Sequence, residues 1–414
     1  MKPGEPKSKK KGRQLLALAA VMFFFSVCLF VLGYADAAAG GGIQLNRKNI
    51  TLTVGKTQKL KVKKLPKNAK ATWKSSKKSV ASVSRKGQVK AKKAGKATIR
   101  CKVTYRKRKT VVLQCKVTVK KKAVEKKSPV YMTTDITPEG LMSVYKALNW
   151  KAEGKVAVKL STGEPPASHY LAPDLIKDLV QYVDGTIVEC NTAYGGDRSG
   201  TAMHRQVAKE HGFTKIAKVD IMDSAGSMSL PVKGGKHLKQ DYVGKHFADY
   251  DSFLVLSHFK GHAMAGFGGA IKNISIGIAS SKGKSYIHSG GTSTSGFGGE
   301  QDAFLESMAE AGKAVSDSLG KGKNIVYVNV MNNLSVDCDC DGNPAKPKMK
   351  DIGILASTDP VALDQACVDL VYKQKNGDGA SLVKRIESRN GLLTLEYGEE
   401  INLGSRSYQL KRLE

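Results

Sequence analysis

Beyond residue 130 the chain alternates short apolar runs with longer amphipathic stretches. The apolar runs have the length and composition of buried strands, and they comprise residues 156–160, 186–191, 219–222, 252–257, 325–330 and 352–356. The amphipathic stretches repeat their apolar residues with helical spacing, and they comprise residues 173–183, 201–211, 303–319 and 360–372. Strands that alternate with helices predict an α/β large domain with a mostly parallel sheet. Sites in such sheets lie at the carboxyl ends of strands, where three polar segments follow: residues 191–201, 258–272 and 332–342.

The segment 43–120 has a different pattern, in which apolar and polar residues alternate singly. The alternation is clearest in residues 99–103 and 111–119. One face of each predicted strand is therefore apolar and the other is rich in Lys, Arg, Thr and Gln, as a small all-β sandwich of two sheets requires. In the register expected for the last two strands, Cys101 lies opposite Cys115 on the inner face. The two cysteines are expected to form a cross-strand disulfide or to remain two buried thiols.

The N-terminus combines a basic flank with an apolar segment. Lys9–Arg13 precede an apolar run from Leu15 to Ala35, which is long enough for a hydrophobic transmembrane helix and has the charge asymmetry of one. The small residues at 35–40 resemble a signal-peptide cleavage site. We therefore expect a signal peptide or a single transmembrane anchor within residues 1–42. In both cases the rest of the chain lies outside the cytoplasm, at the bacterial cell surface or secreted.

The positive charge of the chain is confined to its first third. Among 414 residues, 68 Lys and Arg oppose 36 Asp and Glu, which gives a net charge of +32. Residues 1–127 hold 36 of the basic residues and three acids, a net of +33, whereas the remaining 32 basic and 33 acidic residues sum to −1. An enzyme of nucleic acids carries its positive field over its own cleft, so we expect no specific nucleic-acid partner. The basic segment is expected to attract an anionic cell-wall polymer or a membrane surface, or to be a soluble spacer.

The polar segment 258–272 holds most of the candidate chemistry. Its imidazoles and amines belong to His258, Lys260, His262 and Lys272. An imidazole can ligate a metal or carry a proton near neutral pH, and a lysine can hold an anion or act as a nucleophile. Three glycines would let the backbone approach a ligand closely: Gly266, Gly268 and Gly269. A tight turn with solvated side chains is the alternative interpretation.

Two cysteines lie one residue apart among three aspartates in the segment 336–342. Cys338 and Cys340 form a compact ligand set for a metal ion, and their short separation is expected to disfavour a disulfide between them. Cys190 and Cys367 would complete the four thiolates that an iron–sulfur cluster usually needs. Ordinary core packing is the alternative for these last two residues.

Five short matches within residues 43–120 carry a family resemblance: Leu52–Gly55, Trp73–Ser76, Ser79–Val83, Gly87–Ala91 and Gly95–Ile99. Together they resemble the bacterial immunoglobulin-like group 2 domain. The resemblance implies an extracellular adhesive or spacer module.

Seven segments between residues 130 and 375 carry a second family resemblance: Asn191–Tyr194, Asp197–Arg198, His204–Arg205, Gly212–Phe213, His258–Asn273, Cys338–Cys340 and Asp351–Asp364. Together they resemble the iron–sulfur-centre proteins grouped as domain of unknown function 362. Many relatives carry an inserted ferredoxin-like segment, which this chain lacks. The resemblance implies an iron–sulfur cluster or another metal ion as cofactor.

A more distant similarity links the same domain to the nickel-pincer lactate racemases. Its carriers are His262–Gly269, Lys272, Gly277–Ala279 and His288. The similarity implies that Lys272 tethers a nickel-pincer nucleotide, that His262 is a catalytic base and that His288 ligates the metal. The chemistry is sensible, since an imidazole can accept a hydroxyl proton while the cofactor takes a hydride.

Three functions follow as expectations. The leading one is an exported or membrane-anchored, metal- or iron–sulfur-associated redox-type enzyme on a small anionic substrate, with Arg198 as a clamp for a carboxylate or phosphate. The second is a racemase-like enzyme acting on a 2-hydroxy acid, and the third is a non-catalytic cell-surface binding protein. The expected organisation is a signal peptide or anchor, an immunoglobulin-like domain, a charged linker and a metal-associated α/β domain, at residues 1–42, 43–120, 121–130 and 131–414.

Overall fold

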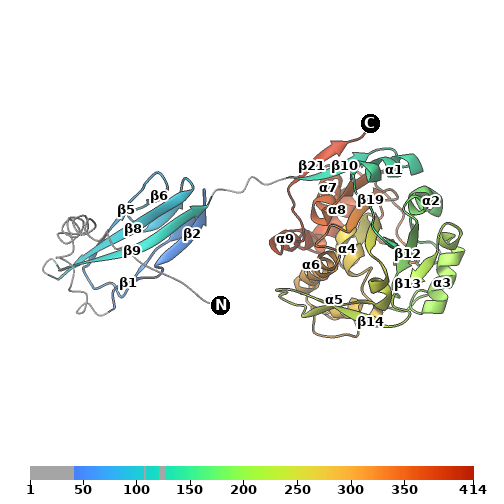
Figure 1. Ribbon diagram of the computed structural model, residues 1–414, viewed down its shortest axis with the longest axis horizontal. Helices are drawn as coiled ribbons and strands as arrows, with labels where there is room; N and C mark the ends of the chain where they lie inside the picture. The colour runs from blue at the N-terminus through green and yellow to red at the C-terminus, as the bar shows by residue number, and fades with distance from the viewer. Residues whose placement is uncertain (1–41, 107–108, 121–126) are drawn as a thin grey trace, which may run out of the picture. The chain divides into compact units, whose positions relative to one another are not determined.

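A computed structural model describes residues 42–106, 109–120 and 127–414. The expected signal peptide or anchor lies outside these residues. The chain divides into two compact units between Val124 and Glu125, and each unit has its own sheets (Figure 1). Within the described ranges, no helix has both the length and the apolar character needed to cross a membrane.

The first unit is an all-β sandwich, as the alternating pattern predicts. Its strands are β1 (Gln44–Leu45), β2 (Asn49–Thr53), β3 (Thr57–Lys59), β4 (Val62–Lys63), β5 (Lys70–Ser75), β6 (Ala81–Val83), β7 (Gln88–Ala91), β8 (Gly95–Tyr105) and β9 (Lys109–Lys120). A four-stranded sheet has the order β2-β9-β8-β5, a three-stranded sheet has the order β3-β7-β6, and β1 pairs with β4. Residues of both larger sheets share one apolar core, which includes Val89, Ile99 and Val117.

The predicted register that places Cys101 opposite Cys115 is wrong, and of the two alternatives for these cysteines the buried thiols are confirmed. The β8–β9 hairpin pairs Cys101 with Leu113 and Ile99 with Cys115, so the cysteines are offset by one pair on the same inner face. The register of the described strands, which pairs Tyr105 with Lys109 and Gly95 with Val119, therefore places the two cysteines past each other. Both are buried free thiols, and burial raises the pKa of Cys101 to about 11.

The second unit is built on an eight-stranded sheet. Its strands are β10 (Ser128–Thr133), β11 (Val156–Lys159), β12 (Gly185–Glu189), β13 (Val219–Ile221), β16 (Ser252–His258), β19 (Ile325–Met331), β20 (Gly353–Ser357) and β21 (Tyr408–Arg412). The order is β13-β12-β11-β16-β19-β20-β10-β21. The first five strands are mutually parallel. The sheet as a whole is mixed, because β20 runs antiparallel to β19 and β10, and β21 is parallel to β10.

Helices cover both faces of this sheet (Figure 1). They are α1 (Pro138–Ala147), α2 (Pro173–Tyr182), α3 (Thr201–Glu210), α4 (Ala270–Ser275), α5 (Ser281–His288), α6 (Gln301–Ser318), α7 (Pro360–Tyr372), α8 (Ala380–Ser388) and α9 (Leu393–Glu400). Apolar residues of α1 and α2 form one core with the sheet, while those of α4, α6 and α7 form another. Two hairpins lie outside the sheet: β14 (Ser227–Pro231) with β15 (Gln240–Gly244), and β17 (Lys260–His262) with β18 (Gly266–Gly268).

The strand order places a site at one edge of the sheet. From β11 the chain moves outward to β12 and β13, and it then returns to add β16 and β19 on the other side of β11. Such a reversal opens a crevice at the carboxyl ends of the strands. The segments that follow β11, β12, β16 and β19 therefore converge there.

Candidate functional site

A cavity of about 330 Å³ lies at the carboxyl ends of these four strands. Lys159, Glu189 and His258 are the last residues of β11, β12 and β16, and all three line it. The segment after β19 adds Cys338 and Cys340. The volume suits a small molecule.

Most of the predicted site residues line this one cavity: Cys190, Arg198, His258, His262, Gly268, Gly269, Lys272, His288, Cys338 and Cys340. They come from segments up to 150 positions apart in the chain. Gly266 does not line the cavity, because a Cβ there would lie 3.1 Å from the backbone of Ile386 and Gly391 on the far side of the β17–β18 hairpin. Its φ of +82° instead suits the hairpin turn.

His258 and Lys260 form a buried polar cluster with Asp339. The Nε2–H of His258 donates to the carbonyl of Asn332 at 2.6 Å, which leaves Nδ1 to accept from the Lys260 amine at 2.9 Å. Lys260 also forms an ion pair with Asp339. Burial and the Lys260 charge hold the pKa of His258 well below its usual range. This imidazole is therefore neutral and tied to the protein.

The hydrogen bonds of His262 and His288 assign them opposite tautomers. Nδ1 of His262 accepts from the backbone N–H groups of Met264 and Ala265 at 3.1 and 2.9 Å, so the proton of the neutral ring lies on Nε2. In His288, Nδ1–H donates to the carbonyl of Lys284 at 2.7 Å, which leaves a lone pair on Nε2. His262 is thus a hydrogen-bond donor, whereas His288 can accept a proton or ligate a metal.

Burial keeps both rings uncharged. Desolvation, with Lys272 and His288 nearby, holds the pKa of His262 well below its usual range. Desolvation also lowers the pKa of His288 to about 4, and its ring stacks on Phe304 with centroids 4.5 Å apart. The racemase similarity assigns the base to His262, but the tautomers favour His288 for that role.

Lys272 is the free amine of the cavity. Within the described part of the chain it has no hydrogen bond or ion pair, whereas Lys159 donates to Leu160 and Asn273 and Lys284 donates to Ala279. Burial lowers the pKa of Lys272 to about 8, and the charges of Lys159, Arg198 and Lys284 add to this effect. An unpaired amine of this kind can bind an anion or react as a nucleophile.

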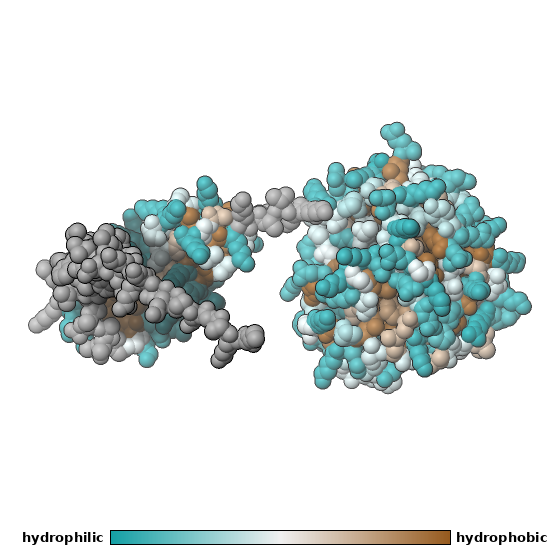
Figure 2. Space-filling view, viewed as in Figure 1, coloured by the Kyte–Doolittle hydropathy of each residue, from teal (hydrophilic) through white to brown (hydrophobic). Residues whose placement is uncertain are grey.

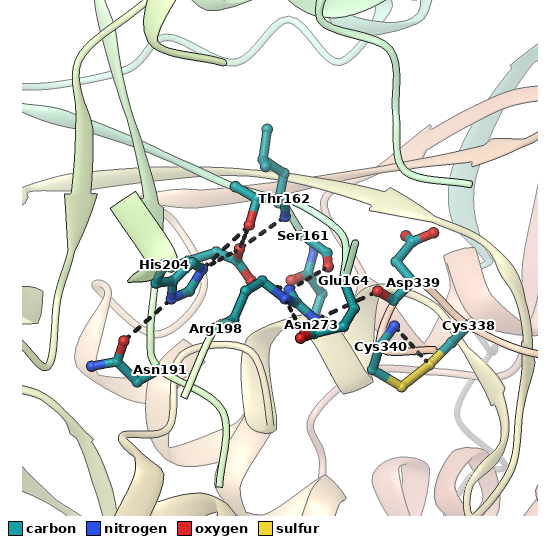
Figure 3. A network of polar contacts seen from close by, with 12 residues as sticks. Ser161, Thr162, Glu164, Asn191, Arg198, His204, Asn273, Cys338, Asp339 and Cys340 are labelled. Carbon is teal, nitrogen blue, oxygen red and sulfur yellow. Dashed lines mark hydrogen bonds and ion pairs between the residues drawn. A yellow bond between two sulfur atoms is a disulfide. The ribbon is translucent and has the colours of Figure 1, made fainter. Parts of the chain in front are cut away.

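Arg198 does not have the free donors that an anion clamp needs. Its five N–H groups donate to five oxygen atoms of the chain, in Ser161, Glu164, Glu189, Tyr194 and Asp339. Figure 3 shows this network beside the Cys338–Cys340 pair. The guanidinium is 3% exposed and its pKa is raised, since the Glu189 and Glu164 charges outweigh the cost of burial. Arg198 is a positioning residue that holds three polar segments together.

Glu189 is the acidic partner in this network. Burial alone would raise its pKa, but the charges of Arg198, His204 and Lys159 hold it well below its usual range. Its carboxylate also accepts from the backbone N–H of Thr162 at 2.8 Å. The carboxylate therefore remains ionised, and it orients His204 and Arg198.

Cys338 and Cys340 form a disulfide, which corrects the expectation that their spacing disfavours one. Their Cα atoms are 5.3 Å apart, within the range of disulfides, because a turn directs both side chains to one side. The backbone N–H of Asp341 closes this turn by donating to the carbonyl of Cys338 at 3.0 Å. The sequence separation alone could not show the turn.

One group in the described residues has the spacing of a metal site. Ligand atoms of His262, Cys338 and Cys340 all lie within 4.8 Å of one another. Metal ligation requires thiolates, so this group could hold an ion only after reduction of the disulfide. The proton on Nε2 of His262 is a second obstacle, since a metal-bound imidazole normally donates through its other nitrogen.

An iron–sulfur cluster does not fit the described cysteines. Cys190 is buried, and its thiol donates to the carbonyl of Ile278 at 3.2 Å, while burial raises its pKa to about 12. Cys367 lies within α7 in the core, where Asn329 donates to it at 3.4 Å. Neither belongs to the group of close ligand atoms around His262. Four thiolates thus do not converge in the part of the chain that the structure describes.

Position 269 has no room for a side chain, because a buried carboxylate lies against it. A Cβ at Gly269 would lie 2.3 Å from Oδ1 of Asp364. That carboxylate accepts from the backbone N–H groups of Ala270 and Ile271 at 2.8 and 2.9 Å. Asp364 therefore satisfies the first amides of α4, and they are not free to bind a phosphate.

Three charged lining residues were not predicted: Lys159, Glu189 and Lys284. Lys159 and Glu189 each carry a charge in a run of apolar strand residues, which is a signal that sequence reasoning could have used. Lys284 lies on α5, a helix that the hydrophobic pattern did not reveal.

A family model described as domain of unknown function (DUF362) matches residues 156–369, more than half of the chain. The chain belongs to this family. A model of the bacterial Ig-like domain (group 2) matches residues 41–112, which indicates a surface or extracellular protein. No curated protein matches the chain.

Solved structures similar to this DUF362 protein include the lactate racemase apoprotein from Thermoanaerobacterium thermosaccharolyticum, with 14% identity and a TM-score of 0.36 over 66% of this chain and 62% of that one. A protein from Thermotoga maritima has 12% identity and a TM-score of 0.31 over 64% and 58% of the two chains. The surface layer protein SbsC, domains 1–6, has 20% identity and a TM-score of 0.16 over 22% and 14%. This chain thus covers less than two thirds of each of these proteins. With TM-scores below 0.5, the similarities say nothing about its activity.

Proposed function

We propose that the large domain of this DUF362 protein is a redox-type enzyme that acts on a small anionic substrate outside the cytoplasm. The observation that carries the proposal is the charge of the cavity. Five cationic side chains line it, those of Lys159, Arg198, Lys260, Lys272 and Lys284, against the two carboxylates of Glu189 and Asp339. With neutral imidazoles and every amine protonated, the formal charge of the lining is +3. Burial lowers the pKa of Lys260 well below its usual range and those of Lys159 and Lys272 to about 8. Even with Lys260 neutral the lining keeps a net positive charge at pH 7, and a low-dielectric pocket of this sign favours an anion.

The cationic side chains of the cavity differ in whether the protein already provides a partner for them. Arg198 and Lys260 are paired with carboxylates, whereas Lys272 has no partner in the described residues. We infer that Lys272 binds the anionic group. The lone pair on Nε2 of His288 can then accept a proton, and Nε2–H of His262 can donate a hydrogen bond to an oxygen or sulfur on which negative charge develops.

The proposal is tested by calorimetric titration of the full-length protein with lactate, malonate and phosphate at pH 7. We expect at least one of these anions to bind, and Lys272→Met to weaken that binding at least tenfold. Lys282→Met is the matched control, since Lys282 is exposed on the neighbouring helix and lies over the ring of Tyr242. Absence of binding by all three anions, or equal binding by both variants, would contradict the proposal.

The second candidate is a racemase-like reaction on a 2-hydroxy acid. It is favoured by the convergence of Lys272, His262 and His288 on one cavity. The free amine of Lys272 and the lone pair of His288 fit a tethered nickel-pincer nucleotide, which would supply hydride chemistry when bound. The tautomer of His262 does not fit the role of base.

Elemental analysis and peptide mass spectrometry of the full-length protein separate the two candidates. Nickel, together with added mass on the Lys272 peptide, would favour the racemase-like reaction. An unmodified Lys272 and the absence of nickel would favour the first candidate, the redox-type enzyme.

We also propose that the basic immunoglobulin-like unit attaches the enzyme to an anionic cell-wall polymer or membrane surface. Between residues 43 and 120 the chain has 26 Lys and Arg and no Asp or Glu. Lys96, Arg100 and Lys102 of β8 are exposed, while the residues between them are buried or partly buried. Hydrophilic side chains cover much of the visible surface of this unit in Figure 2. A dense field of one sign attracts polyanions of any sequence.

A further inference from the structure

The Cys338–Cys340 disulfide forms part of the wall of the cavity. Cys338 is 8% exposed, whereas Cys340 is only partly buried. Both cysteines line the cavity, and Cys340 is the more exposed of the two residues. In a thiol–disulfide exchange, the accessible sulfur is the one that a thiolate attacks.

The turn that carries the disulfide is fixed from several directions. The carbonyl of Asp339 accepts from the backbone N–H of Glu164 at 2.8 Å and from Arg198 at 3.4 Å, and its carboxylate pairs with Lys260. On the other side, Arg385 donates to the carbonyl of Val336 at 2.7 Å. These anchors hold both cysteines in the wall of the cavity.

One donor contacts Cys338, and an imidazole lies close to both sulfurs. The backbone N–H of Cys340 donates to Sγ of Cys338 at 3.3 Å. A ring nitrogen of His262 lies within 4.8 Å of both sulfurs, and the neutral ring has an N–H to donate. Hydrogen-bond donors and cations around a sulfur make it a better leaving group.

We infer that the Cys338–Cys340 disulfide is the redox group of the cavity and that it oxidises a small anionic dithiol. This inference deepens the proposed function and rests on it. A disulfide can persist in this role because the immunoglobulin-like domain indicates a surface or extracellular location, where disulfides are stable.

The reaction balances in atoms and electrons. A substrate thiolate attacks Sγ of Cys340, a mixed disulfide forms, and the bond between the two cysteines breaks to release the Cys338 thiolate. The second substrate thiolate then attacks the substrate sulfur of the mixed disulfide and releases Cys340. The substrate loses two electrons and two protons and becomes a disulfide, while the two cysteines become thiols. Exchange with a second disulfide reverses these steps and regenerates the site.

The test compares an anionic with a neutral dithiol on the oxidised full-length protein. Dihydrolipoate and dithiothreitol are each incubated with the folded protein at pH 7.5, the reaction is quenched with acid, and the thiols are alkylated and mapped by mass spectrometry. Each rate is divided by the rate at which the same dithiol reduces a small soluble disulfide. This normalisation cancels the difference in intrinsic reactivity between the two dithiols. Relative to protein that has not met a dithiol, whose free cysteines are alkylated as well, we expect two more alkyl groups per chain, on Cys338 and Cys340. The normalised rate should be at least tenfold higher for dihydrolipoate.

Variants test the assigned roles. Lys272→Met should remove the preference for dihydrolipoate, and Lys282→Met should preserve it. His262→Phe should slow exchange at least tenfold, whereas His262→Gln keeps an N–H donor and should retain most of the rate. With the monothiol 3-mercaptopropionate, the mixed disulfide should be trapped on Cys340 and not on Cys338.

Three outcomes would overturn the inference: reduction of the pair only after unfolding, isolation of the protein with two free cysteines that bind a metal, or equal normalised rates for the two dithiols. The calorimetric titration with small anions distinguishes a failure of this inference from a failure of the proposed function. If small anions bind but the disulfide does not exchange, only the inference fails. If the disulfide exchanges without charge preference and no anion binds, the proposed function fails.

Discussion

Replacing Arg198 by methionine removes the cation that holds the polar network of the site together. Its guanidinium lies 2.9 Å from the Glu164 carboxylate and 3.4 Å from that of Glu189, and all three side chains are less than a tenth exposed. Removing one partner of a buried ion pair leaves an uncompensated charge and costs about 3–5 kcal/mol. For a unit of this size we expect the melting temperature of the large domain to fall by about 10 °C.

The pH dependence identifies the cause of this loss. Because the folded-state pKa of Glu189 is held below its usual value, its ionised form stabilises the fold above the unfolded-state pKa of about 4.3, and that stability is lost as the pH falls through the folded value. In Arg198→Met, burial without the cation raises the pKa of Glu189. The deficit relative to wild type should therefore be largest at pH 7 and shrink toward pH 4.5.

Scanning calorimetry of the full-length variants at pH 7 and 4.5 is the assay. Arg198→Met/Glu189→Gln should recover part of the loss, since it removes the stranded charge. Arg406→Met is the matched control, because its pair with Glu396 is 32% and 56% exposed and such pairs contribute about 0–1 kcal/mol. A loss below about 2 °C at pH 7, or a loss that grows at pH 4.5, would refute the reasoning.

Three further predictions concern the cavity, its scaffold and the basic unit. Affinity for the anion bound by Lys272 should fall as the pH rises through about 8, where this amine loses its proton. Calorimetry from pH 6.5 to 9.5 should show a smaller step in Lys272→Met, which keeps only the contribution of Lys159, whose pKa is also lowered to about 8. Gly269→Ala should destabilise the large domain by about 1–3 kcal/mol because of the 2.3 Å approach to Asp364, whereas Gly298→Ala, whose Cβ meets nothing within 4 Å, should melt like wild type. Binding to vesicles that contain phosphatidylglycerol should weaken steadily between about 0.1 and 1 M salt, as screening shortens from roughly 10 to 3 Å, and cosedimentation that is insensitive to salt would contradict an electrostatic attachment.

The central strands of the large domain could be predicted because burial on both faces leaves an unmistakable apolar run. The order of these strands could not, and neither could β10 or the edge strand β21 beside it. β21 pairs only with β10, and its residues are exposed or half-buried, so it lacks an apolar pattern. The helix α5 was missed because its sequence has few apolar residues. The helix α8 was also missed, although it buries Leu382, Val383 and Ile386 at helical spacing.

The convergence of His262, Lys272 and His288 could be predicted, since polar segments after parallel strands meet at one edge of the sheet. Their protonation could not. The tautomer of His262 is set by two backbone amides of the β17–β18 hairpin, and that of His288 by a carbonyl one helical turn earlier. Likewise, the sequence alone makes Arg198 a candidate anion clamp. Only the fold shows that its donors already bond to oxygen atoms of the chain.

Lysine labelling tests most directly whether Lys272 is the anion-binding amine of the cavity. With a pKa of about 8, about a quarter of Lys272 is neutral at pH 7.5, against about one in a thousand for a lysine with the ordinary value of about 10.4. Brief acetylation of the full-length protein at pH 7.5, read by peptide mass spectrometry, should label Lys272 faster than Lys282, and the anion found by calorimetry should protect Lys272 alone. Equal labelling of both lysines, unchanged by the anion, would contradict the account.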